Sequence, residues 1–192
     1  MQEASDDTVL GDFDNAKFVY EGVTTTFYKK DDSFWVETDN EKGQLRDYPV
    51  KYVFGVYPLQ QLLLPTKEGS LNALSMAWDS RKSSEGGQRW YHIYEGQDPV
   101  SADSPLHWTG IYHNWNSRCA ECHSTNVVKG YDAASRTYTT TYDQIDVGCE
   151  ACHGPGSQHV QWAQEGKVRA GQTPADVGLQ LSLAARGQWQ RA

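Results

Sequence analysis

Two five-residue motifs constrain this chain more than any other feature of its sequence. The first is Cys119-Ala120-Glu121-Cys122-His123, and the second is Cys149-Glu150-Ala151-Cys152-His153. Together they hold all four cysteines among the 192 residues. Each reads C-x-x-C-H, the attachment signature of a c-type haem. Two thiols at this spacing can form thioethers with the vinyl groups of one porphyrin, and the histidine that follows can bind the iron.

We therefore predict two covalently attached c-type haems. The thioethers come from Cys119 and Cys122 for one haem and from Cys149 and Cys152 for the other, with His123 and His153 as proximal ligands. A zinc site is the main alternative, but 26 residues separate Cys122 from Cys149. That is more than the roughly 15–20 of a zinc ribbon, and zinc gives no reason for a histidine after each pair. Two disulfides are a weaker alternative, because C-x-x-C pairs usually undergo redox cycling.

The other four of the six histidines compete for the distal iron positions. Two histidine ligands on each haem suit electron transfer, whereas an open position suits binding or turnover of a small molecule. His159 follows His153 by six residues, across a Gly-Pro-Gly-Ser turn. Six extended residues reach about 20 Å at most. We therefore predict that His159 ligates the Cys119/Cys122 haem or another nearby haem, and a surface histidine at a helix start is the alternative.

His92 and His107 compete for the second distal position, and a buried histidine satisfied by the backbone is the alternative for both. His113 and Met76 are weaker candidates. Guanidinium groups bind carboxylates in a fork. Arg89 and Arg118 could therefore hold haem propionates, although surface arginines are the commoner case.

Composition and charge narrow the possible partners. The chain is 38% hydrophobic and carries a formal net charge of −8. An acidic protein is unsuited to nucleic acid and to anionic lipid, and suits basic redox partner proteins. No apolar run is long enough to span a membrane directly, and no signal peptide is recognisable. Since haem attachment takes place outside the cytoplasm, we expect a periplasmic or exported protein, present as a mature form or an excised piece.

The pattern of the chain predicts an α+β fold. Alternating β-branched and aromatic residues indicate an antiparallel β meander or small sheet in the N-terminal half. The C-terminal half is predicted to be a loop-rich haem-binding region with short helices. We divide the chain into a β-rich scaffold portion, 1–95, and a dihaem portion, 96–192, which could also form one continuous domain. The expected strands are 17–20, 23–28, 34–38, 48–54, 71–78 and 88–94, the expected helices are 160–167 and 173–185, and residues 106–116 are expected to wrap the first haem.

Several stretches resemble a known family, the multihaem c-type cytochromes that are often fused to tetratricopeptide repeats. They are Gly55-Val56-Tyr57-Pro58-Leu59-Gln60-Gln61, Ala77-Trp78-Asp79-Ser80-Arg81, Gly86-Gly87-Gln88-Arg89-Trp90-Tyr91-His92, Leu106-His107-Trp108-Thr109-Gly110, Asn114-Trp115-Asn116 and the first motif with Ser124-Thr125-Asn126. The second motif with Gly154-Pro155-Gly156-Ser157-Gln158-His159 is similar to one shared more widely, in which the last histidine commonly serves a different haem. The resemblance implies a periplasmic or exported redox protein. Such proteins usually carry a further C-x-x-C-H upstream and helical repeats downstream, so we expect a central two-haem portion with further haem domains as partners.

The predicted function is one-electron transfer, and an electron carrier is favoured over a catalyst. One alternative is a multihaem oxidoreductase acting on a small nitrogen or sulfur compound at an open haem iron. The other is a zinc-stabilised binding module, which would be colourless. A high-spin spectrum would indicate the open haem.

Overall fold

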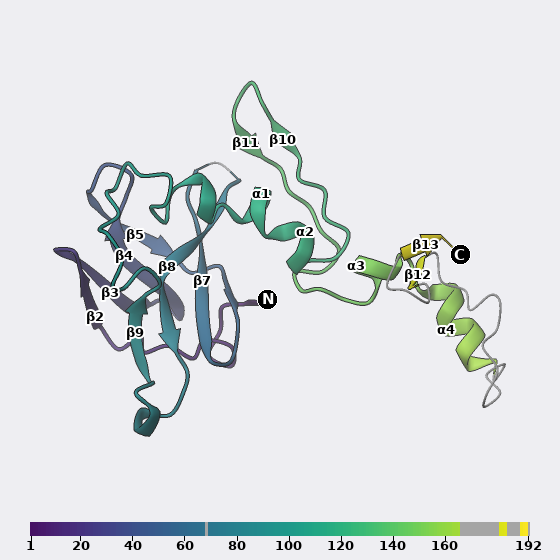
Figure 1. Ribbon diagram of the computed structural model, residues 1–192, viewed down its shortest axis with the longest axis horizontal. Helices are drawn as coiled ribbons and strands as arrows, with labels where there is room; N and C mark the ends of the chain where they lie inside the picture. The colour runs from purple at the N-terminus through teal and green to yellow at the C-terminus, as the bar shows by residue number, and fades with distance from the viewer. Residues whose placement is uncertain (68, 166–180, 184–188, 192) are drawn as a thin grey trace. The chain divides into compact units, whose positions relative to one another are not determined.

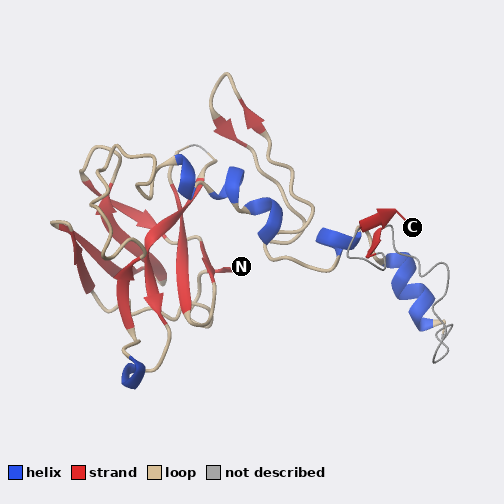
Figure 2. Ribbon diagram, in the orientation of Figure 1, coloured by secondary structure: helices blue, strands red, loops and turns tan. Residues whose placement is uncertain are grey.

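The computed structural model describes residues 1–67, 69–165, 181–183 and 189–191 (Figure 1). Its contacts divide the chain into two compact units. The first comprises residues 1–121 and 127–141, and the second comprises residues 122–126 and those from 142 onward. These bounds differ from the expected portions 1–95 and 96–192. The α+β class is confirmed, since the sheets lie mostly in the N-terminal half and the helices are short and late (Figure 2).

The first sheet of the first unit is an antiparallel meander in the order β2-β3-β4-β5. Its strands are β2 (Ala16–Tyr20), β3 (Val23–Lys30), β4 (Ser33–Asp39) and β5 (Leu45–Pro49). In β4 the buried side chains Phe34, Val36 and Thr38 alternate with less buried ones, as expected for a strand with one face on a core. Gly22 and Asp32 adopt positive φ in the two tight turns.

The second sheet has the order β1-β6-β7-β8-β9 and is also antiparallel. Its strands are β1 (Gln2–Glu3), β6 (Tyr52–Phe54), β7 (Leu59–Pro65), β8 (Leu71–Asp79) and β9 (Arg89–His92). The single strand expected at 48–54 is wrong, because β5 ends at Pro49 and β6 begins at Tyr52 in the other sheet. Proline has no N–H to continue a ladder, so it suits the end of a strand.

One hydrophobic core is shared by the two sheets. Phe27 of β3 stacks on Trp90 of β9, with ring centroids 3.6 Å apart and planes 2° from parallel. All nine residues of β8 are buried. This strand also contacts the 3-10 turn η2 (Ile111–His113) and α1 (Trp115–Arg118), which lead into the first motif. The β core therefore anchors the segment from which the first motif begins.

The remaining elements are short. The first unit has the 3-10 turn η1 (Ser83–Glu85) and the hairpin β10 (Tyr131–Asp132) and β11 (Thr137–Tyr138). The two motifs contain α2 (Ala120–His123) and α3 (Glu150–His153), followed by α4 (Ser157–Gln164), β12 (Leu181–Leu183) and β13 (Trp189–Arg191). No helix in the described part of the chain has the length and apolar character needed to cross a bilayer.

Both expected C-terminal helices need correction. The helix expected at 160–167 exists but begins earlier, at Ser157, directly after the Gly-Pro-Gly turn. The helix expected at 173–185 lies mostly outside the described residues. Its described part is wrong, because Leu181–Leu183 form β12, paired antiparallel with β13.

Candidate haem-attachment site

The first motif begins where α1 ends, and α1 is fixed to the β core by two asparagines. The Oδ1 of Asn114 accepts the backbone N–H of Ser117 at 2.9 Å, which caps the helix. The Oδ1 of Asn116, which is 1% exposed, accepts the N–H of Leu71, the first residue of β8, at 2.8 Å. Cys119 then donates its N–H to the carbonyl of Trp115 at 3.0 Å. Cys119 is thereby held at the edge of the first unit's folded core.

The geometry of the motifs fits covalent haem. In the second motif His153 donates its backbone N–H to the carbonyl of Cys149 at 2.9 Å, which is a helical turn. Residues three and four apart in a helix share one face, so the two thiols and the imidazole can meet the same ligand. Cys122, Cys149 and Cys152 are exposed free thiols, and Cys119 is half-buried. Neither motif therefore closes on itself as a disulfide.

The zinc alternative has no preformed site. Among the described residues, no group of three or more His, Cys, Asp or Glu side chains is placed to hold a metal ion. Covalent haem needs no such preformed cluster, because its porphyrin supplies four iron ligands and the chain adds only axial ones.

The segment after His123 is hydrogen-bonded to the segment before Cys149, and we call this the intermotif contact. Thr125, which is 1% exposed, donates its hydroxyl to the carbonyl of Asp146 at 3.0 Å and accepts the N–H of Gly148 at 2.8 Å. Its backbone N–H donates to the carbonyl of Gln144 at 3.0 Å. Ser124, also 1% exposed, donates to the carbonyl of Ile145 at 2.8 Å. The end of one motif and the start of the next therefore lie side by side within the second unit.

We expect Thr125→Val to disrupt the intermotif contact, because valine keeps the shape but leaves the Gly148 N–H and the Asp146 carbonyl unpaired. Each buried polar group left without a partner costs about 1–3 kcal/mol. Hydrogen exchange at the amide of Gly148 measures the effect, and we expect at least tenfold faster exchange. Thr125→Ser retains the hydroxyl and is the matched control. Equal exchange rates in both variants would show that the hydroxyl does not hold the two segments together.

A carboxylate fixes the turn between His153 and His159. The Oε1 of Glu150 accepts the N–H of Gly156 at 2.7 Å, directly before α4 begins. His159, in the first half of α4, is half-buried and stacks on Trp162, with centroids 5.4 Å apart and planes 20° from parallel. Glu150 thus restrains the part of the chain that sets the separation of the two histidines. The assignment of His159 as an iron ligand stays a prediction.

His107 and His113 are buried in the first unit with both ring nitrogens engaged. The Nε2 of His107 lies 3.1 Å from Oδ2 of Asp39, and its Nδ1 lies 2.8 Å from Oγ1 of Thr109. His113 places Nδ1 3.0 Å from the carbonyl of Ala73 and Nε2 3.1 Å from the Tyr94 hydroxyl. Neither imidazole offers a free nitrogen to an iron. These contacts argue against His107 as a distal ligand and agree with the alternative of a satisfied buried histidine.

His92 is also part of the β core. Its ring stacks on Tyr20, with centroids 3.7 Å apart and planes 6° from parallel, and its Nδ1 accepts the N–H of Tyr94 at 3.2 Å. Met76 is its cross-strand neighbour and is 5% exposed. The side chains of His92 and Met76 therefore belong to the interior of the two-sheet unit. In the segment 106–116, Trp108, Trp115 and Asn116 are also buried within the first unit.

Burial and, to a smaller extent, the nearby imidazoles of His113 and His107 together lower the pKa of His92 to about 4, against the opposing effect of Asp39. Between about pH 6.5 and pH 4 the unfolded chain binds this proton and the folded chain does not. Stability is therefore complete above pH 6.5 and falls as the pH drops toward 4, by on the order of 2 kcal/mol.

We expect His92→Phe to reduce this acid sensitivity, because phenylalanine keeps the stack on Tyr20 and cannot be protonated. The measurement is the urea midpoint of unfolding at several pH values between 4 and 7, in wild type and variant. Burial also lowers the pKa of His113, so the urea midpoint of the variant should still fall toward low pH, but less steeply than that of the wild type. An unchanged slope would exclude His92 as its source.

The two candidate propionate partners differ in their surroundings. Arg118 directly precedes Cys119, and its guanidinium lies 5.2 Å from the centre of the Tyr112 ring. Arg89 lies on β9 and pairs with Glu95 at 3.7 Å. Only Arg118 adjoins a C-x-x-C-H motif in sequence, so it is the better placed of the two for a propionate.

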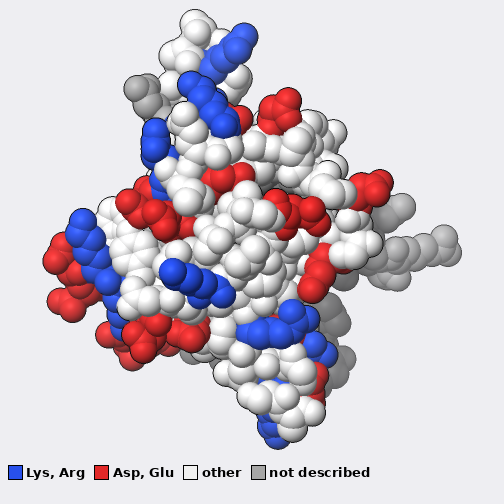
Figure 3. Space-filling model, turned by 90° about the vertical axis from the view of Figure 1, so that its left-hand side faces the viewer, with Lys and Arg blue, Asp and Glu red and all other residues white. Residues whose placement is uncertain are grey.

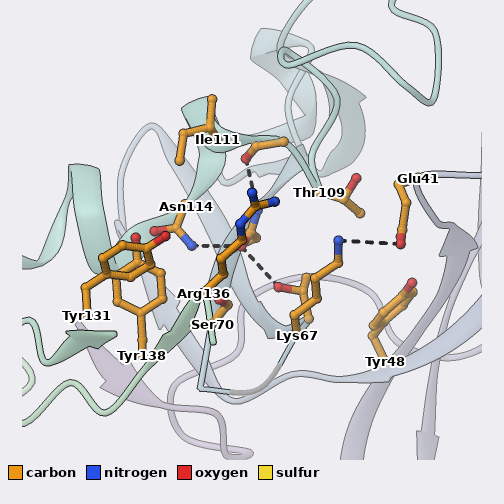
Figure 4. A pocket seen from close by; sticks show the side chains of 13 residues that line it. Glu41, Tyr48, Lys67, Ser70, Thr109, Ile111, Asn114, Tyr131, Arg136 and Tyr138 are labelled. Carbon is orange, nitrogen blue, oxygen red and sulfur yellow. Dashed lines mark hydrogen bonds and ion pairs between the residues drawn. The ribbon is translucent and has the colours of Figure 1, made fainter. Parts of the chain in front are cut away.

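The first unit also contains an open cavity of about 330 Å³ between the β sheets' loops and the β10–β11 hairpin (Figure 4). Lys67 and Arg136 lie at its rim, and Lys67 is paired with Glu41 at 3.8 Å. Its buried polar centre is Asn72, whose amide donates to the carbonyls of Trp108 and Gly110 at 3.0 and 3.1 Å. Because both of these hydrogen bonds hold β8 to the loop that contains Trp108 and Gly110, Asn72 has a structural role. We therefore assign this cavity to the scaffold and not to a ligand site.

Two C-x-x-C-H motifs on short helices, with three exposed thiols and one half-buried thiol, fit the attachment of c-type haem. A family model described as "Cytochrome c554 and c-prime" matches residues 77–154. The match begins within β8 and ends directly after His153, so it contains both motifs and the intermotif contact. It supports the c-type cytochrome family, whose haem is covalently bound. No curated protein and no solved structure matches the chain.

Proposed function

We propose that this chain is a multihaem c-type cytochrome that passes single electrons through two covalently attached haems. The intermotif contact is the observation that carries the proposal. Ser124 and Thr125 link the end of the first motif to the start of the second by buried hydrogen bonds. Two haems attached at adjoining segments can exchange electrons with each other. When bound, the haem supplies the reversible Fe(III)/Fe(II) couple.

The residues of this chain have distinct parts in the proposal. Four cysteines tether the porphyrins, and His123 and His153 bind the irons from the proximal side. His159 supplies a distal nitrogen to a neighbouring haem, held in place by the Glu150 contact with Gly156. The maturation of such haems places the protein in the periplasm or outside the cell.

The redox partner is proposed to be a basic protein. The formal net charge is −8, and two haems with ionised propionates add negative charge. On the face shown in Figure 3, acidic and basic side chains are interspersed over the β unit. We therefore propose that redox partners, including further haem domains, dock near the haems of this chain. The association should weaken at high salt.

One observation favours the alternative function at an open iron. Of six histidines, two are proximal, His107 and His113 have both ring nitrogens hydrogen-bonded, and the ring of His92 is buried in the β unit, which leaves His159 as the distal candidate outside that unit. One of the two haems would then take its sixth ligand from another protein segment or bind a small molecule. A multihaem oxidoreductase with a small nitrogen or sulfur substrate fits this second arrangement.

The test is to produce the full chain in an exported form in a host that attaches c-type haem. Intact mass should show two haems per chain, and dithionite should produce sharp reduced bands. A shift of part of the reduced spectrum on addition of carbon monoxide would favour the alternative function at an open iron. No carbon monoxide response would favour a pure carrier with two six-coordinate haems. A colourless protein that contains zinc would overturn the proposal.

A further inference from the structure

The first unit contains a second, smaller cavity that the proposed electron transfer does not use. Its volume is about 220 Å³. The walls come from β2, β3, β4, β8 and β9 and from residues 100–108. Pockets for drug-sized ligands usually occupy roughly 300–1,000 Å³. A porphyrin is thus excluded, and only a molecule of a few non-hydrogen atoms fits.

His92 supplies a hydrogen-bond donor to this cavity. It is 6% exposed and lines the cavity wall. Because its Nδ1 accepts the N–H of Tyr94 at 3.2 Å, the neutral ring carries its proton on Nε2. No described residue accepts a hydrogen bond from that Nε2. That N–H is therefore free to donate to a molecule held in the cavity.

Asp39 supplies an acceptor in the same wall. Its side chain is 12% exposed, and Oδ2 lies 3.1 Å from Nε2 of His107. The Nδ1 of His107 is held by Thr109, so His107 directs its own N–H at the carboxylate. A carboxylate has about four acceptor sites on its two oxygens. Asp39 therefore keeps acceptor capacity after binding His107 and its 3.5 Å contact with Thr38.

The charges around the cavity disfavour an anionic ligand, because Asp39 and Glu21 are among the lining residues and no lysine or arginine is. A ligand that pairs with both His92 and Asp39 needs an acceptor as well as a donor, and a cation that only donates lacks the acceptor. The remaining wall includes the apolar side chains Val23, Met76 and Leu106, which favour a short hydrocarbon portion.

We propose that this cavity binds a small neutral molecule of the short primary amide class. Its carbonyl oxygen accepts from Nε2 of His92, its N–H group donates to Asp39, and its alkyl portion contacts the apolar wall. The site lies in the β unit and is independent of haem attachment.

The test compares three probes of the same shape and different charge: acetamide, acetate and acetamidinium. The haem-loaded full chain is labelled with 15N-histidine and reduced, and the ring nitrogens of His92 are followed by NMR during each titration. We expect a saturable shift of Nε2 with acetamide and none with acetate or acetamidinium. Saturation by acetamidinium alone would overturn the neutral class, and no saturable shift with any probe would overturn the site.

His92→Phe provides the variant, because it keeps an aromatic ring on Tyr20 and removes the Nε2 donor, together with the Nδ1 acceptor of the Tyr94 N–H. We expect acetamide affinity to fall at least tenfold, measured from the shift of the 15N-labelled His107 ring. Undiminished affinity would overturn the role of His92. The comparison of probes on the wild-type chain stands by itself if the variant does not fold.

Discussion

Replacing Cys149 and Cys152 together by serine will leave one covalently attached haem on the chain instead of two. Serine cannot form a thioether, so the second porphyrin loses both covalent bonds while His153 remains. The expected intact mass falls by one haem, and the haem absorbance per chain falls by half. Cys119→Ser with Cys122→Ser should give the same loss at the first motif, and the fourfold variant should carry no haem.

The two pairwise variants also separate the haems spectroscopically. If His159 binds the first haem, loss of that haem should leave the second motif's spectrum largely unchanged. Glu150→Gln is a suitable control within the second motif, because glutamine retains an oxygen that can accept the N–H of Gly156. Two haems remaining in either pairwise variant would contradict the assignment of the cysteines, and zinc in place of haem would contradict the class of protein.

The fold was predictable where local pattern decides it. The strands 17–20, 23–28 and 34–38 were expected from β-branched and aromatic residues between polar turns, and β2, β3 and β4 cover them. The break after Pro49 was not predicted, because the change from one sheet to the other depends on which strands pair: β5 pairs with β4, whereas β6 pairs with Leu62 and Leu63 of β7. Periodicity reports which residues alternate, and it does not report the strand with which they pair.

The same distinction between local and distant features applies to the site. The C-x-x-C-H motifs are local, so the sequence alone suffices to predict His123 and His153 as proximal ligands, and this assignment stays a prediction. Distal ligands depend on where distant segments fold, so the sequence alone could not show that Nε2 of His107 lies 3.1 Å from Oδ2 of Asp39. The intermotif contact was missed, since Ser124 and Thr125 read as ordinary loop residues. Only their burial and their partners in the segment 144–148 mark them as structural.

Phe27→Ala should cost the β unit about 3–5 kcal/mol of stability. The ring of Phe27 is fully buried on β3, and it stacks on Trp90 of β9 in the opposite sheet. The edge of Phe13 also packs against it at a centroid distance of 5.7 Å. Alanine would leave a cavity between the two sheets at the point where three aromatic rings meet, and the core cannot close it without moving a sheet.

The measurement is urea unfolding followed by far-ultraviolet circular dichroism, whose β-sheet signal comes mainly from the two sheets of the first unit. Val19→Ala is the matched control, since Val19 lies on β2 of the same sheet and is 63% exposed. We expect that control to change the free energy of unfolding by about 0.5 kcal/mol or less. If Phe27→Ala costs no more than the control, the two sheets do not share a core. The β unit would then be unable to anchor α1 and, through it, the first haem motif.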